Sequence, residues 1–187
     1  MAQRPVFVLS ALAVGCAPLA NLRPAGELAD NHRSYELGAA AVGLGPRPYV
    51  EEEWQLTGQV WGTLALSRWV ELSAIGAFDN SGLAAGGALR WTPLSLHRVA
   101  AGGEVELGFA WAALALPVAV QPLDGVWLYT APRLGNQGVY LTPAVPLGLS
   151  VQTFQGLMVR AEVDVSWADF LAYQRRTHLG FGLAYQW

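Results

Sequence analysis

Charged residues, lysine and cysteine are all scarce in this chain. Asp, Glu, Lys and Arg make up only 13% of its 187 residues, against about a quarter in ordinary soluble proteins. All 11 basic residues are Arg, and the formal net charge is −3. The high apolar content of 53% excludes intrinsic disorder, and the scattered arginines argue against a nucleic-acid partner.

Long apolar runs are also missing. No stretch of 18 apolar residues occurs, so a transmembrane helix is not expected. From about residue 34 onward the apolar residues alternate with polar or small ones instead, as Glu162 and Asp164 do with Val163 and Val165. A period of two is typical of β-strands. It predicts eight strands, at residues 34–45, 51–66, 69–79, 82–93, 99–115, 137–152, 157–169 and 177–187.

The first 15 residues have the features of a secretory signal peptide: one positive charge and an apolar stretch too short to span a membrane. The only cysteine follows, in the sequence Leu12-Ala-Val-Gly-Cys16. This run resembles the lipobox of bacterial lipoproteins, which implies cleavage before Cys16 and acylation of its thiol. The alanine at position 17 implies, by the same resemblance, sorting to the outer membrane. Residues 16–33, rich in Pro, Asn and mixed charges, are predicted to be a linker.

Alternation alone does not tell a soluble lipocalin-like barrel from a membrane barrel, but the ends of the strands do. Aromatic residues of the apolar face fall in two groups separated by aliphatic residues, as in the aromatic girdles of outer-membrane barrels. One group is Trp54, Phe78, Trp111 and Trp167, and the other is Tyr35, Trp91, Tyr185 and Trp187. The apolar face is therefore predicted to face lipid, with tight connections at the inner end.

The C-terminal residues Gly182-Leu-Ala-Tyr-Gln-Trp187 place a glycine and aromatics at alternate positions and end the chain on an aromatic. This ending resembles the terminal signal of outer-membrane barrels, and residues 34–187 resemble small barrels of the OmpA/OmpX type. The resemblance implies an all-β, eight-stranded, antiparallel up-and-down transmembrane barrel, integral to the outer membrane. The lipid of Cys16 is then expected in the periplasmic leaflet.

The polar face carries many charges that are predicted to form a network inside the lumen. An eight-stranded barrel is just wide enough for side chains to fill, and buried charges must be paired. We expect the lumen to be closed by its own side chains, with a proton or cation path as the alternative. The predicted network consists of Glu36, Glu53, Glu71, Arg90, Glu104, Glu106, Arg160, Glu162 and Asp164.

The segment 117–136 is long for a connection, and it contains Trp127, Leu128 and Tyr129. Long loops are frequently functional, so these three residues are predicted to contact a surface ligand or a protein partner. Two alternatives are a hairpin that extends the wall and a strand pair that would make a ten-stranded barrel.

Catalytic chemistry has only a weak signal. Ser166, Asp164 and His178 share the polar face of the last predicted hairpin, but three polar residues on a lumen wall are common. No metal-ligand spacing and no cofactor motif is present. The sequence predicts a non-enzymatic outer-membrane lipoprotein with a structural or surface-interaction role. The alternatives are an outer-membrane lipid hydrolase and a lipid-tethered lipocalin-like carrier.

Overall fold

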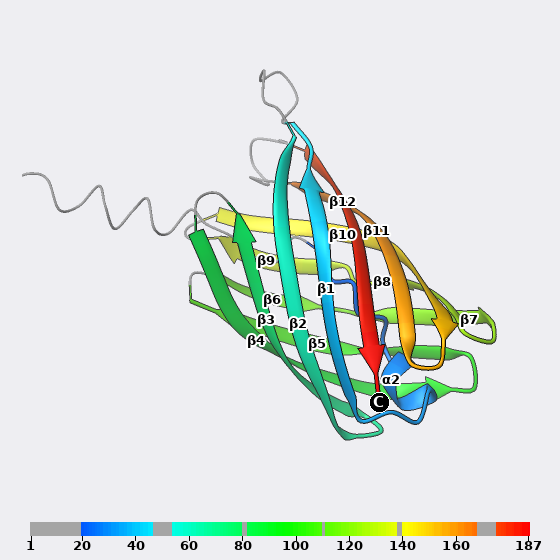
Figure 1. Cartoon of the computed structure of the whole chain (residues 1–187). Coiled ribbons are helices and arrows are strands. Elements are labelled where there is room, and N and C mark those ends of the chain that lie inside the picture. The colour runs from blue at the N-terminus through cyan, green and yellow to red at the C-terminus, as the bar shows by residue number, and fades with distance from the viewer. Residues whose placement is uncertain (1–19, 47–53, 80–81, 110, 138–139, 168–174) are drawn as a thin grey trace, which may run out of the picture.

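The computed structural model describes residues 20–46, 54–79, 82–109, 111–137, 140–167 and 175–187. They form one closed antiparallel sheet and one short helix (Figure 1). The elements are α2 (Glu27–Asp30), β1 (Tyr35–Leu44), β2 (Gln55–Ser67), β3 (Val70–Asp79), β4 (Gly82–Leu96), β5 (Val99–Gly108), β6 (Trp111–Ala115), β7 (Val118–Leu123), β8 (Val126–Thr130), β9 (Arg133–Gln137), β10 (Tyr140–Phe154), β11 (Leu157–Trp167) and β12 (Arg175–Gln186). No helix among the described residues has the length and apolar character needed to cross a membrane.

The twelve strand segments occupy ten positions in the barrel wall. Both β6 and β7 pair with β5, and both β8 and β9 pair with β10, so each pair of segments is one interrupted strand. The interruptions fall at Pro117 and Pro132, which have no N–H to donate to the sheet. Their carbonyls still accept bonds of 2.9 Å, from the N–H of Gly102 and of Leu116 respectively. Pairing of β12 with β1 and β11 closes the ring.

The prediction of an antiparallel barrel is confirmed, but the prediction of eight strands is wrong. Residues 99–115 were expected to be one strand, whereas β5 ends at Gly108 and β6 begins at Trp111. The predicted loop 117–136 is the strand pair that completes the wall, and its turn, Asp124-Gly125, lies at the end of the barrel that holds the C-terminus. The ten-stranded alternative is the one observed.

The outer face of the wall is apolar. Large aliphatic side chains point away from the lumen on every part of the wall, for example Leu83, which is 77% exposed, and Leu147, which is 67% exposed. At one rim, the ring of Trp187 stacks on those of Tyr35 and Tyr185. This arrangement is opposite to that of a lipocalin-like carrier, which has an apolar interior and a polar surface. Trp111 is an exception to the predicted girdle, because its side chain is buried in the lumen.

The two ends of the barrel differ. At one end lie the start of β1, the end of β12 and four two-residue turns, at 68–69, 97–98, 124–125 and 155–156. The glycines of two of these turns, Gly125 and Gly156, have positive φ angles of 75° and 85°, which other residues rarely adopt. We call this the terminal end and the opposite one the loop end. Short turns at the terminal end match the inner end of outer-membrane barrels.

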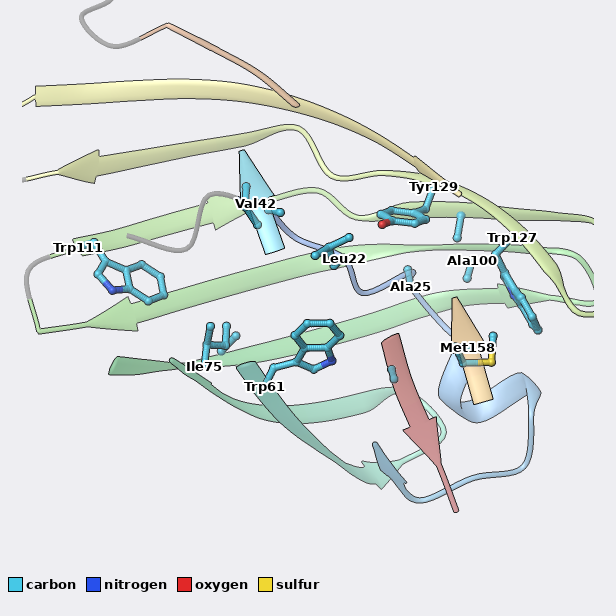
Figure 2. Packing of buried hydrophobic residues seen from close by; sticks show 14 residues of the cluster. Leu22, Ala25, Val42, Trp61, Ile75, Ala100, Trp111, Trp127, Tyr129 and Met158 are labelled. Carbon is cyan, nitrogen blue, oxygen red and sulfur yellow. The ribbon is translucent and has the colours of Figure 1, made fainter. Parts of the chain in front are cut away.

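Residues 20–28, which were predicted to belong to a linker, lie inside the barrel, and residues 29–33 lead from its interior to β1. Residues 20–28 are all buried, and α2 lies at the terminal end, where the chain then enters β1 (Figure 1). Figure 2 shows Leu22 and Ala25 among lumen-facing side chains of the wall, including Trp61 and Met158. We call residues 20–33 the plug segment. A ten-stranded barrel is wider than an eight-stranded one, so the plug segment supplies the volume that side chains alone would leave empty.

Candidate functional site

The lumen and the plug segment form the most elaborate polar site of the described residues. Glu162, at the middle of β11, binds the first described residues of the plug segment. One carboxylate oxygen accepts the backbone N–H of Asn21 at 2.8 Å, and the other accepts that of Leu22 at 2.9 Å. The side-chain amide of Gln59 donates to the carbonyl of Ala20 at 2.9 Å. Bonds to a carboxylate are roughly twice as strong as neutral ones, so Glu162 fixes the backbone of the segment regardless of its side chains.

Arg160, two residues before Glu162 on the same face, connects the plug segment to three strands. Its guanidinium donates to the carbonyl of Leu22 at 2.7 Å and to the two Glu36 oxygens at 2.8 and 2.6 Å. It also pairs with Glu27 of α2. The Gln186 amide donates to both carboxylates, at 3.1 Å to Glu27 and 2.8 Å to Glu36. Four of these groups are charged or amide side chains that would be costly to bury alone, and each has a partner here.

A second ionic cluster lies on the opposite side of the plug segment. Arg90 of β4 donates to Glu104 at 2.6 Å, to the carbonyl of Pro24 at 3.1 Å and to the side-chain oxygen of Asn21 at 3.1 Å. Arg23 of the plug segment reaches Glu104 at 3.0 Å and Glu106 at 3.7 Å. The wall therefore binds the plug segment with charges of both signs, an arginine for Glu27 and carboxylates for Arg23.

Shape complements these charges. Gly26 has a φ of +74° and lies so close to β5 that an added Cβ would be 2.7 Å from the Cβ of Ala100. On β12, a Cβ at Gly180 would be 3.3 Å from that of Ala20. Between the plug segment and the wall remains a polar cavity of about 10 Å³, bordered by Arg23, Glu71 and others, which is room for about one water molecule.

The predicted lumen residues are brought together, apart from one. Their side chains are buried in the barrel interior, on both sides of the plug segment; they are Glu36, Glu71, Arg90, Glu104, Glu106, Arg160, Glu162 and Asp164. Glu53 and Cys16 lie outside the described residues. The predicted contact residues are placed differently, because Trp127 and Tyr129 point into the lumen and Leu128 points outward from a wall strand. Their role in partner contact stays a prediction, and the loop on which it depended is a strand pair.

Sequence reasoning missed three charged partners in the lumen. Arg23 and Glu27 were assigned to a linker, and Arg133, which binds Asp164 at 2.9 Å, to a loop. A signal for them was present, because seven carboxylates were expected to share a closed lumen with only Arg90 and Arg160. That imbalance required further cations from elsewhere in the chain. Among the described residues, no group of three or more His, Cys, Asp or Glu side chains could hold a metal ion.

Comparisons with known proteins give likenesses of structure only. No family model and no curated protein matches the sequence. The attachment invasion locus protein Ail of Yersinia pestis aligns with a TM-score of 0.42 and 10% identity, over 82% of this chain and 97% of that one. Neisserial surface protein A aligns with a TM-score of 0.39 and 8% identity over 82% and 97%. The N-terminal β-barrel domain of Pseudomonas aeruginosa OprF gives 0.35 and 11% over 80% and 97%.

Proposed function

We propose that this chain is an outer-membrane β-barrel protein whose lumen is closed by its own N-terminal segment, and that it acts as a scaffold rather than as a pore. The observation that carries the proposal is the binding of residues 20–28 inside the wall through Glu162, Arg160 and Arg90. A pore needs a continuous water-filled path. Here the backbone of the plug segment occupies that path at mid-height.

The apolar outer face supports the location in a membrane. Exposed leucines, valines and aromatics would be covered by lipid, and their exposure to water would favour aggregation. The short turns, the start of β1 and the end of β12 all lie at the terminal end, which supports an orientation with that end in the periplasm. A barrel in this orientation presents its loop end to the cell exterior, and a structural or surface-interaction role fits that placement.

The lipid anchor at Cys16 is part of the proposal. Ala20 is buried in the lumen, and the four residue-to-residue steps from Cys16 to Ala20 span at most about 14 Å when extended. An acylated Cys16 therefore has to reach the bilayer through a mouth of the barrel within that distance of Ala20. The chain runs from Ala20, which contacts Gln59 in the loop-end half of β2, to α2 at the terminal end, so the mouth nearest to Cys16 is the one at the loop end. In the orientation proposed above this mouth faces the cell exterior, so the periplasmic leaflet predicted for the acyl chains does not fit the closed lumen.

The proposal is tested by conductance in planar bilayers. The wild-type barrel should show no steady conductance. The double variant Arg23→Ala/Glu27→Gln removes the two plug-segment side chains that form ion pairs with Glu104, Glu106 and Arg160 of the wall, and should produce intermittent channels. These channels should prefer cations, since the wall carries more carboxylates than arginines.

Arg98→Ala is the matched control, because it removes an exposed ion pair with Asp124 at a turn and should leave the barrel closed. Large, steady wild-type channels would overturn the closed lumen.

A further inference from the structure

A serine, a histidine and an aspartate meet on the lumen wall near the loop end, where the plug segment makes no described contact. The Ser166 Oγ lies 3.2 Å from Nε2 of His178. The other ring nitrogen, Nδ1, lies 3.9 Å from Oδ2 of Asp164. The two neighbours therefore approach opposite nitrogens of one imidazole, as a nucleophile and an orienting acid do in hydrolytic sites.

The pairing of β11 with β12 produces this arrangement. Asp164 is directly opposite His178 in the register, and Ser166 follows Asp164 by two residues on the same face. All three side chains are buried and come from two strands of a closed sheet, which hold them more rigidly than loops would. The geometry is thus fixed by the wall itself.

The aspartate is held from the other side by Arg133 of β9, whose guanidinium donates to Oδ2 of Asp164 at 2.9 Å. The second oxygen, Oδ1, is buried and has no hydrogen-bond partner among the described residues. The 3.9 Å between Nδ1 of His178 and Oδ2 of Asp164 is longer than a hydrogen bond. Catalytic hydrogen bonds are often longer without substrate, so 3.9 Å is compatible with such a role.

The plug segment leaves this cluster on the loop side. Glu162, which binds Asn21 and Leu22, comes two residues before Asp164 along β11, and β11 runs toward the loop end. Asp164 and Ser166 thus lie successively closer to the loop end of β11 than Glu162, which binds Asn21 and Leu22.

We propose that Ser166, His178 and Asp164 form a catalytic site that hydrolyses small carboxylic esters entering from the loop end. Oγ of Ser166 bonds to the ester carbonyl carbon, and its proton passes to Nε2 of His178. The intermediate then expels the alcohol, which takes that proton. Water attacks the acyl-serine, giving its proton to the same imidazole, and the carboxylic acid leaves as Ser166 regains a proton. Asp164 orients the imidazole and stabilises its charged form.

The test uses the full-length barrel in detergent micelles, with a fluorophosphonate probe and a short-chain p-nitrophenyl ester. The probe should bind covalently to Ser166, as mapped by mass spectrometry of the wild-type protein. Ser166→Ala should abolish labelling and lower ester hydrolysis at least about 100-fold, and His178→Gln should do the same. Asp164→Asn should lower the rate and change its pH profile, a result that a merely structural role would not give.

Ser73→Ala is the matched control, since Ser73 is also buried in the lumen but bonds to Thr63 at 2.9 Å. This variant should keep full labelling and activity. The mapping on wild-type protein does not depend on whether any variant folds. An unlabelled Ser166 in folded wild-type barrel, or a hydrolysis rate equal to that of Ser166→Ala, would overturn the proposal.

Discussion

Arg160 donates a hydrogen bond of 2.7 Å to the carbonyl oxygen of Leu22, a residue 138 positions earlier in the chain. This bond joins the plug segment to the middle of β11. The same guanidinium pairs with Glu27 of α2 and with Glu36, so one side chain links two parts of the plug segment to β1. The closed lumen therefore depends on a few buried ions, and their substitution should have large effects.

Arg160→Met should lower the free energy of unfolding by about 3–5 kcal/mol, because it leaves Glu27 and Glu36 buried without their cation. Urea unfolding in detergent, followed by tryptophan fluorescence, measures this change. Arg98→Met is the control, since it removes an exposed ion pair and should cost less than about 1 kcal/mol. Equal effects of the two variants would show that Arg160 does not hold the plug segment.

Gly26→Ala should also destabilise the barrel, by about 1–3 kcal/mol, because Gly26 has a φ of +74° and an added Cβ would overlap Ala100. The double variant Gly26→Ala/Ala100→Gly removes the overlap and should recover part of the loss. Gly103→Ala provides the comparison, since an added Cβ there meets nothing within 4 Å. Urea unfolding measures the free energy of unfolding of each variant. A Gly26→Ala variant as stable as the wild type would show that the plug segment does not pack tightly against β5 at this position.

Substitution on the outer face should depend on depth. Val60 and Leu66 share the outer face of β2, but Val60 lies near its middle and Leu66 near its terminal end. Arginine on the lipid face costs about 2–4 kcal/mol at the bilayer midplane and about 0–1 near the interfaces. Val60→Arg should therefore reduce folding into lipid vesicles much more than Leu66→Arg, as measured by protease protection. Similar yields of the two variants would indicate a wall that faces water.

The mass of the mature protein should show cleavage before Cys16 and addition of acyl chains. The expectation comes from Leu12-Ala-Val-Gly-Cys16 after a short apolar stretch. Intact-mass spectrometry of protein purified from a bacterial envelope measures it, and Cys16→Ser should remove the added mass. A mature chain that begins elsewhere, or that carries no acyl group, would contradict the lipid anchor.

Strand periodicity was readable from sequence because it is local. Successive residues of a strand point to opposite sides, so Arg160, Glu162 and Asp164 were assigned to one face from the alternation alone. The weak points were residues where alternation stops. The chain turns after Gly108, and Pro117 and Pro132 divide two strands into segments of five or six residues. Short, proline-interrupted segments carry too little pattern to be told from a loop.

The sequence by itself determined antiparallel strands with one polar and one apolar face, because both follow from the period of two. The aromatic residues at the strand ends then indicated that the apolar face points outward. The tertiary structure decided the number of strands, the burial of residues 20–28 and the meeting of Ser166 with His178. These features depend on the width of the closed ring and on contacts between residues far apart in the chain, such as Asn21 with Glu162. Residues 20–33 have no strand period of their own, and only the closed wall supplies the charges that bind them.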